Sequence, residues 1–354
     1  MRGSIDNSLV RFDYDLPDEL IAQSPAPQRD ASRLMVLRGP LTEHRTFRDL
    51  PQLLACDDLL VLNETKVVPA RLRGRRSGGG ETELLLLHPA DSLRYDVAAK
   101  NWIAMSRPAR RMHAGDRITF GELGEARVVR ELPHGLREVE FSVTLPFEEF
   151  LSRAGQMPLP PYIHNDSMEA QQRYQTVFAR VAGSVAAPTA SLHFTPEVFR
   201  AIERRGIEVA RITLDVGVGT FRPVTAESVD DHIMHAEAYE ISEAAASALQ
   251  AARADGRRIV AAGTTVVRAL EGNLAAFGAV TPGRHATDLF IRPGFRFRAT
   301  DGLLTNFHLP RSTLLMLVSA FAGVQRIREA YAEAIALRYR FYSFGDAMLI
   351  APER

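Results

Sequence analysis

Strand patterns dominate one stretch of this chain, whereas helix and strand patterns alternate further along it. Between about residues 66 and 143 there are six short β-forming segments separated by turn residues, at 67–73, 82–88, 102–107, 117–120, 126–131 and 138–143. Strands that follow one another without helices predict an all-β module. Alternation of helices with strands predicts a mostly parallel sheet with helices packed on it. The chain is therefore expected to be an α/β protein that contains a separate β module.

Start and stop signals place several elements of the α/β part. Thr195, followed by a proline, is typical of a helix start, and Gly206 ends this helix before a strand at 207–214. Ser242 starts an alanine-rich helix in the same way, ahead of an apolar strand at 258–262. These signals predict alternating helices and strands over this part of the chain.

Two early segments also have strand character. Residues 57–63 have the composition of a buried strand, and 12–17 opens with alternating polar and apolar residues. If both join the later sheet, the β module is an insertion in a discontinuous α/β domain.

Composition is typical of a large globular protein from a reducing compartment. The chain has 354 residues, of which 46% are hydrophobic, enough for two domains. Cys56 is the only cysteine, so there is neither a disulfide framework nor a thiolate cluster for a metal. No apolar run typical of a signal peptide follows the N-terminus, and the most apolar stretch, 314–323, is shorter than the roughly 20 residues that cross a bilayer. We expect a cytoplasmic protein in which 314–323 is a buried helix.

Basic residues are concentrated in one part of a chain that is neutral overall. The whole chain has 43 basic and 43 acidic residues, but 66–130 contains 13 basic and 7 acidic ones. This excess is enough for a basic face, although arginine-rich loops are often only solvated. The candidates for phosphate contacts are Arg71, Arg73, Arg75, Arg76, Arg107, Arg110 and Arg111.

Two motifs suggest a function, but the residues around each motif argue against it. The glycine-rich stretch 214–220 is similar to the turn of Rossmann-type methyltransferases, but bulky Phe221 follows it and Pro223 disfavours a helix there. His232 and His235 are spaced to share a helical face, yet the further ligands of a metal site are missing from the sequence around them. We expect no metal, and we expect these histidines to form hydrogen bonds or contact a substrate.

Three denser clusters of polar and small residues are typical of a ligand site. Residues 183–194 place small residues around a proline, which allows close approach of a ligand to the backbone. Gly263, Thr264 and Thr265 follow a buried strand and begin a helix, where open α/β sheets bind ligands. Residues 301–312 are interpreted as a polar loop that leads into the buried helix.

Eight stretches of the chain together resemble one family, the S-adenosylmethionine:tRNA ribosyltransferase-isomerases of queuosine biosynthesis. They run in order from Phe12 to Met316, within a match that extends to Ile350. The stretches are 12–17, 62–67, 157–163, 166–174, 183–194, 217–223, 263–268 and 305–316.

The resemblance implies both a fold and a reaction. The fold is an α/β domain, residues 1–65 and 155–354, interrupted by a small antiparallel β-barrel domain at 66–154. The reaction moves and isomerises the ribosyl part of S-adenosylmethionine onto a 7-aminomethyl-7-deazaguanine at the wobble position of tRNA. Its products are epoxyqueuosine in tRNA, adenine and methionine, and the enzyme is expected to be a monomer without a prosthetic group.

The chemistry of this reaction suggests roles for the clustered residues. A base must remove a proton beside the sulfonium, and an acid near the adenine eases its departure. The candidate acid and base groups are His193, Asp215, His232, His235 and His308. Tyr174, Thr189, Thr264, Thr265, Arg268 and Asn306 are the candidate substrate contacts, with Arg268 suited to the methionine carboxylate.

Two positions depart from the family pattern, and two other functions remain open. Ser191 stands where the family commonly has glycine, and Asp215 where it commonly has histidine. If the aligned histidine transfers protons, either the carboxylate of Asp215 replaces the imidazole or another group has taken over. The alternatives are an S-adenosylmethionine-dependent RNA methyltransferase and a non-catalytic RNA-binding protein.

Overall fold

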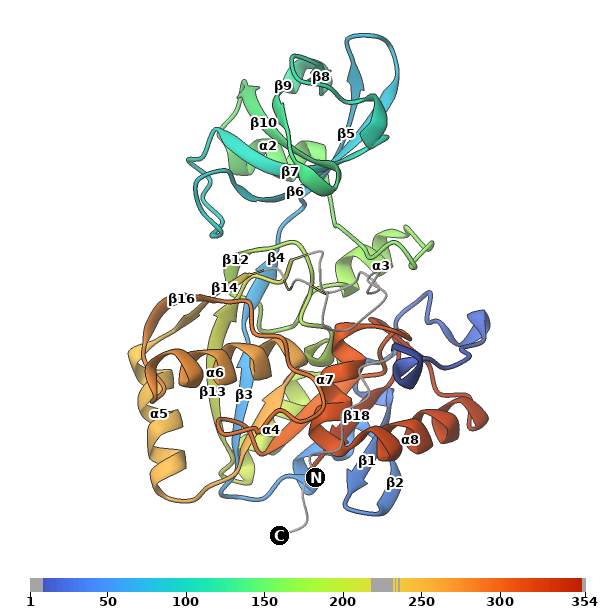
Figure 1. The fold of residues 1–354 in the computed structure, drawn as a ribbon, viewed down its shortest axis with the longest axis vertical. Coiled ribbons are helices and arrows are strands. Elements are labelled where there is room, and N and C mark those ends of the chain that lie inside the picture. The colour runs from blue at the N-terminus through green and yellow to red at the C-terminus, as the bar shows by residue number, and fades with distance from the viewer. Residues whose placement is uncertain (1–8, 218–231, 233, 235, 352–354) are drawn as a thin grey trace, which may run out of the picture.

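The computed structural model describes residues 9–217, 232, 234 and 236–351. Figure 1 shows a small barrel above a larger α/β body, with the chain crossing twice between them. The barrel contains the strands from β5 to β10, and the body contains both the beginning and the end of the chain. The predicted fold class, an α/β domain interrupted by an antiparallel β-barrel, is confirmed.

A nine-stranded sheet forms the centre of the α/β domain. Strands β13, β3, β15 and β17 are mutually parallel neighbours, whereas the strands toward both edges include antiparallel pairs. From one edge to the other the order is β16 (Gly283–Thr287), β14 (Glu237–Ile241), β13 (Glu208–Leu214), β3 (Leu59–Asn63), β15 (Ile259–Ala262), β17 (Gly302–Asn306), β18 (Ala347–Ile350), β1 (Arg33–Arg38) and β2 (Leu41–Thr46).

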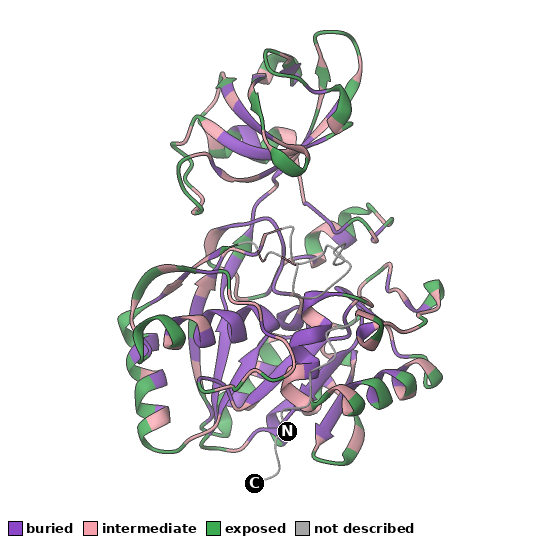
Figure 2. Cartoon of the chain, in the orientation of Figure 1, coloured by how far each residue is buried: buried purple, intermediate pink, exposed green. Residues whose placement is uncertain are grey.

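Both faces of this sheet are buried. In β3, Leu59 and Val61 pack into one core and Leu60 and Leu62 into the other, because successive side chains of a strand point to opposite faces. Helices α5 (Glu243–Ala254), α6 (Thr264–Phe277), α7 (Thr313–Ala322) and α8 (Val324–Ala336) cover the first face, and α1 (Leu50–Leu53) and α4 (Pro196–Arg204) cover the second. Figure 2 shows the buried strands between partly exposed helices, the arrangement expected for a largely parallel sheet.

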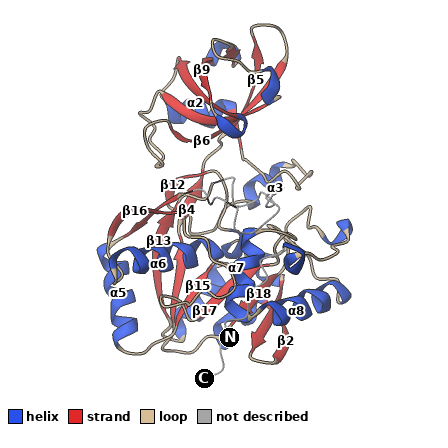
Figure 3. Cartoon of the chain, in the orientation of Figure 1, coloured by secondary structure: helices blue, strands red, loops and turns tan. Residues whose placement is uncertain are grey.

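Six antiparallel strands close into the barrel. Pairing of β5 with β8 completes the ring, and helix α2 (Phe147–Ala154) contributes buried Phe150 to its core beside Trp102. The strands, drawn in Figure 3, are β5 (Arg71–Arg76), β6 (Glu81–Pro89), β7 (Asn101–Arg107), β10 (Leu136–Val143), β9 (Gly124–Glu131) and β8 (Arg117–Thr119).

Two short strand pairs mark the crossings between the domains. Strand β4 (Thr65–Val67) pairs with β12 (Val181–Ser184) of the α/β domain, and β11 (Gly155–Gln156) pairs with β5 of the barrel. We propose that the two junctions lie a few residues after the predicted boundaries of 65/66 and 154/155.

Three sequence-based predictions of local structure are wrong. Residues 12–17 form no strand, because their side chains are engaged elsewhere: the Tyr14 ring packs edge-on against Tyr331 at 5.2 Å. Residues 302–306 are not a loop but β17, which pairs with β15 and β18. The predicted strand at 67–73 is divided between β4 and β5, because Pro69 lacks the N–H that a continuous strand needs.

The apolar stretch near residue 314 forms the buried helix α7, as predicted. Ser312 caps it by accepting a hydrogen bond from the Leu315 amide at 3.1 Å. Within the described ranges, every helix is too short or too polar to cross a membrane.

Candidate active site

A hollow lies where the central strands of the α/β domain end. It measures about 610 Å³, including the part that is open to solvent. Loops that follow β13, β15 and β17 contribute to its wall, together with residues 187–190 and 342–343. The carboxyl ends of parallel strands therefore meet at this hollow, which we call the cavity.

Strand direction explains why residues far apart in the sequence share the cavity. Strand β18 runs antiparallel to β17, with Asn306 opposite Ala347. The residues just before β18 therefore lie beside the end of β17. This arrangement brings Tyr342 and Ser343 to the wall next to Asn306.

The N-terminus of helix α6 contributes backbone amides and two hydroxyls to the wall. Gly263 has φ +110, a conformation that favours glycine, and it turns the chain from β15 into the helix. Thr264 and Thr265 are buried and line the cavity. The first amides of a helix have no partner within it, so this end favours a negatively charged ligand group.

Asn306 presents an unused hydrogen-bond acceptor in the cavity wall. Its Nδ2 lies 3.2 Å from Nε2 of His193, whereas its buried Oδ1 has no partner in the described part of the chain. His193 stands behind Asn306 and is not itself part of the wall. Burial lowers the pKa of His193 to about 3, so the ring is neutral at pH 7.

The neutral state of His193 fixes its tautomer. Since the amide Nδ2 of Asn306 is a donor, Nε2 of His193 accepts, and the ring proton is on Nδ1. Nδ1 lies 3.0 Å from the hydroxyl oxygen of Ser32 and donates to it. His193 therefore orients Asn306.

His308 lines the cavity directly. Its Nε2 lies 2.8 Å from the Thr305 hydroxyl, and its backbone N–H donates to the Tyr331 hydroxyl at 2.9 Å. Its carbonyl accepts a hydrogen bond from Tyr14. Burial lowers the pKa of His308 to about 3, so this imidazole also is neutral at pH 7.

Asp215 lies at the end of β13, one residue before Val216 of the cavity wall. Burial raises its pKa to about 6, and a hydrogen bond from Thr65 opposes the rise only in part. The backbone of Gly183 approaches so closely that a β-carbon there would lie 2.6 Å from Oδ1. Of His193, His308 and Asp215, Asp215 is thus the group that changes charge closest to neutral pH.

The structure brings some of the predicted site residues together and leaves others apart. Thr189, Thr264, Thr265, Asn306 and His308 line the cavity. His193 and Asp215 lie outside this wall, as described above. Tyr174 is buried against Phe344, and His232 lies beside Phe290. Arg268 forms a buried ion pair with Glu237. His235 lies outside the described residues.

Five polar residues of the wall were not predicted from the sequence. They are Tyr162, Thr305, Ser312, Tyr342 and Ser343, and the hydroxyls of Tyr162 and Ser343 are 2.6 Å apart. Tyr162 lies in one of the family-like stretches, which was the available signal. Ser191, where the family commonly has glycine, is buried in a 3₁₀ turn, and its φ is not positive, so a side chain is tolerated there.

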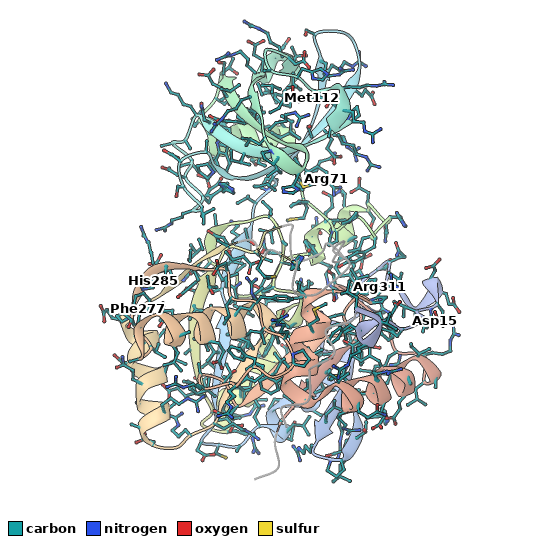
Figure 4. All side chains as sticks on the ribbon, in the orientation of Figure 1. Asp15, Arg71, Met112, Phe277, His285 and Arg311 are labelled. Carbon is teal, nitrogen blue, oxygen red and sulfur yellow. The ribbon has the colours of Figure 1, made fainter. Side chains whose placement is uncertain are left out.

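Most of the predicted tRNA-binding arginines lie on the barrel surface. Arg71 differs, because it is half-buried at the neck between the domains, where it donates to the Leu159 carbonyl at 2.6 Å (Figure 4). Arg76 is half-buried and donates to the Arg111 carbonyl at 2.6 Å. The exposed members are Arg73, Arg75, Arg107, Arg110 and Arg111.

Buried Arg137 fixes the turn that carries two of these arginines. Its guanidinium donates to the carbonyls of Met112, Leu136 and Ala109, each at 2.7 Å. The turn Ala109–Arg111 is therefore held against the barrel with Arg110 and Arg111 exposed.

Comparison with known proteins gives one consistent result. Residues 9–350 match the family described as queuosine biosynthesis protein. The chain is 53% identical over 347 residues to an S-adenosylmethionine:tRNA ribosyltransferase-isomerase of Pelotomaculum thermopropionicum, with 97% of this chain and 99% of that protein covered. It is 54% identical over 346 residues to the protein of that name from Symbiobacterium thermophilum, with the same coverage.

A solved structure agrees with these relatives. The crystal structure of S-adenosylmethionine tRNA ribosyltransferase from Thermotoga maritima is 37% identical in sequence, with a TM-score of 0.54. The similarity covers 96% of this chain and 99% of that one.

Proposed function

Because this chain belongs to the queuosine biosynthesis protein family, we propose that it is an S-adenosylmethionine:tRNA ribosyltransferase-isomerase. It transfers and isomerises the ribosyl moiety of S-adenosylmethionine onto 7-aminomethyl-7-deazaguanine at the tRNA wobble position. The products are epoxyqueuosine in tRNA, adenine and methionine. The observation that supports this most strongly is the match to named relatives along almost the whole chain, with the cavity placed at the strand ends where such a substrate binds.

The cavity wall suits the two ends of S-adenosylmethionine. The methionine carboxylate is placed at the N-terminus of α6, where backbone amides and the hydroxyls of Thr264 and Thr265 favour an anion. Asn306 Oδ1 accepts a hydrogen bond from the nucleoside, and Thr189 contributes a further hydroxyl. Arg268 takes no part in this proposal, because Glu237 already neutralises it.

Proton transfer needs a base whose pKa is near the working pH. The sulfonium acidifies the neighbouring 5′ carbon of the ribose, and removal of that proton leads to loss of methionine as a neutral thioether. We propose Asp215 as this base, because it directly precedes Val216 of the cavity wall and its pKa of about 6 leaves the carboxylate charged at pH 7 and still able to accept a proton. His308, with a pKa of about 3, hydrogen-bonds the substrate as a neutral ring, and His232 and His235 stay predictions from sequence.

The tRNA approaches from the barrel side. The exposed arginines of the barrel contact phosphates, and the wobble base enters the cavity turned out of the loop. S-adenosylmethionine is a substrate rather than a bound cofactor, and we propose that the enzyme uses no prosthetic group and acts as a cytoplasmic monomer.

Products distinguish this function from the alternatives. The protein is incubated with S-adenosylmethionine and tRNA that carries the aminomethyl-deazaguanine base. Equimolar free adenine and methionine support ribosyl transfer. S-adenosylhomocysteine would instead indicate a methyltransferase, and unchanged S-adenosylmethionine would indicate a binding protein.

A further inference from the structure

Three arginines from distant parts of the chain gather on the side of His193 away from the cavity. Arg29 and Arg173 line a second, smaller hollow together with His193 and Ser343. Arg340 lies near enough for its charge, like that of Arg29, to act on the His193 ring. Arg173 ends helix α3 (Met168–Arg173), Arg29 begins the 3₁₀ turn Arg29–Ala31 before β1, and Arg340 lies in the loop before β18. We call this second hollow the arginine pocket.

Among the described residues, these guanidinium groups are bonded to backbone carbonyls and not to carboxylates. Arg29 donates to the carbonyl of Leu192 at 2.9 Å, Arg173 to that of Ala26 at 2.8 Å, and Arg340 to that of Ser24. Carbonyls orient the groups without cancelling their charge.

Two described carboxylates near the pocket already have other partners. Asp30 is 3.6 Å from Arg48, and Asp346 is 3.1 Å from Arg33. Asp346 also accepts from the backbone amides of Arg33 and Arg340, at 2.9 and 2.8 Å. The charge of Asp346 also acts on Arg340, but these two carboxylates, each with an arginine partner of its own, do not balance three further arginines. In the described part of the chain, the arginine pocket therefore has an excess of positive charge.

Two further observations favour the binding of an anion in this pocket. The Nε of Arg173 is buried and has no hydrogen-bond partner within the described residues. Burial and the neighbouring charge of Arg173 lower the pKa of Arg29 to about 10, so the two groups repel each other in a partly dehydrated setting. An anion that accepted hydrogen bonds from both would remove the repulsion and satisfy the free donor.

We propose that Arg29, Arg173 and Arg340 bind a backbone phosphate of the tRNA beside the wobble nucleotide. This inference rests on the proposed function, because it makes the arginine pocket the neighbour of the reacting base. The two hollows share Ser343, and His193 of one is bonded to Asn306 of the other. A nucleotide whose base occupies the cavity therefore has its backbone close to the arginine pocket.

Phosphate fits this pocket better than the methionine carboxylate does. Guanidinium forks bind phosphate oxygens in pairs, and three forks exceed what one carboxylate can accept. With the open part of each included, the hollow measures about 240 Å³ against 610 Å³ for the cavity, which favours a small group such as a phosphate over a whole nucleotide. The carboxylate already has a place at the N-terminus of α6.

Separate binding measurements on the full chain test the proposal. Arg29→Gln and Arg173→Gln are compared with Arg48→Gln, a neighbouring exposed arginine that pairs with Asp30. Each variant is titrated with an anticodon stem-loop RNA that carries the aminomethyl-deazaguanine base, over a series of salt concentrations. Binding of S-adenosylmethionine is measured without RNA.

The expected result is weaker binding of RNA without a change in the binding of S-adenosylmethionine. Each pocket variant weakens RNA binding about tenfold at 0.1 M salt, and the log–log salt slope falls by about 0.7 to 0.9 per arginine removed. The affinity for S-adenosylmethionine and the behaviour of Arg48→Gln stay as in the unmodified protein. Arg340→Gln, which removes a single carbonyl contact, replaces any variant that does not fold.

Two outcomes would overturn the proposal. Weaker binding of S-adenosylmethionine with unchanged RNA binding would assign the arginines to the methionine carboxylate. Unchanged binding of both ligands would leave the arginines a structural role only. The unmodified protein of the same preparation is also tested for release of adenine. If it releases adenine, either outcome contradicts the proposal for the arginine pocket and leaves the proposed function intact.

Discussion

Nε2 of His193 lies 3.2 Å from Nδ2 of Asn306, and this contact joins the cavity to the arginine pocket. Asn306 lines the cavity, and His193 lines the arginine pocket. Since the imidazole is neutral, it accepts from the amide and leaves the Asn306 carbonyl oxygen as an acceptor. The position of Asn306 therefore depends on a residue that does not itself line the cavity.

Replacing His193 should disturb binding without removing an ionisation. His193→Ala deprives the Asn306 amide of its acceptor, so kcat/KM for S-adenosylmethionine should fall about tenfold to a hundredfold. His193→Gln, whose side chain can both accept and donate, should recover part of the loss. The pH profile of kcat should keep its shape between pH 5 and 9, because His193 is already neutral there. An ionisation that disappeared with His193 would show instead that this residue transfers the proton.

Asp215 should set the acidic limb of the pH profile. Its carboxylate must be charged to accept a proton, so kcat should rise through about pH 6 and level off above it. Asp215→Asn should lower single-turnover rates at least about a hundredfold and abolish this limb. A variant that kept both rate and limb would exclude Asp215 as the base.

Asp215 should make the folded protein less stable as the pH rises, whereas it makes catalysis faster. The folded pKa of about 6 is above the unfolded value of 3.8, so the folded state binds more protons between these values. Its contribution to stability is complete below about pH 4 and is lost as pH rises through 6. Asp215→Asn should therefore raise the Tm at pH 8 and leave it nearly unchanged at pH 4, as followed by thermal melts. An equal change in Tm at both values would contradict the raised pKa.

Two glycines at the ends of α6 offer a matched comparison. Gly263 has φ +110 and Gly278 has φ +77, so alanine should cost about 1–3 kcal/mol of stability at either end. Only Gly263→Ala should also weaken S-adenosylmethionine binding, because only that end of the helix lines the cavity. Unfolding in denaturant and equilibrium binding check the two effects. Equal affinities in both variants would separate the helix N-terminus from the substrate.

The exposed arginines of the barrel should affect RNA binding through charge alone. Changing Arg75, Arg107, Arg110 and Arg111 together to glutamine should weaken tRNA binding and reduce its salt dependence. The control pair, Arg117→Gln and Arg127→Gln, removes exposed arginines that are each 2.6 Å from a glutamate. A salt slope equal to that of the unmodified protein in the fourfold variant would assign these arginines to solvated surface.

Local signals in the sequence were enough to predict the elements that depend on them. Thr195 and Ser242 cap helices α4 and α5 through their hydroxyls, as predicted, and five of the six predicted strands of the barrel region correspond to observed strands. Strand β17 was missed because it has only five residues, begins with glycine and ends with Thr305 and Asn306. What makes it a strand is pairing with neighbours that are distant in the sequence.

Residues of the candidate site could be predicted where they directly follow a strand, but not where their position depends on the order and direction of the strands. Thr264 and Thr265 could be found because a glycine and a helix start follow an apolar strand. Tyr342 and Ser343 could not, because their place in the wall depends on β18 running antiparallel to β17. The ion pair of Arg268 with Glu237, 31 residues apart, likewise has no local signal.

The most direct test is mass analysis of the wobble nucleoside. tRNA that carries 7-aminomethyl-7-deazaguanine is incubated with the protein and S-adenosylmethionine, digested, and analysed for its modified nucleosides. We predict conversion to epoxyqueuosine with one adenine released for each nucleoside converted. An unchanged aminomethyl-deazaguanine nucleoside, with S-adenosylmethionine intact, would contradict the proposed function.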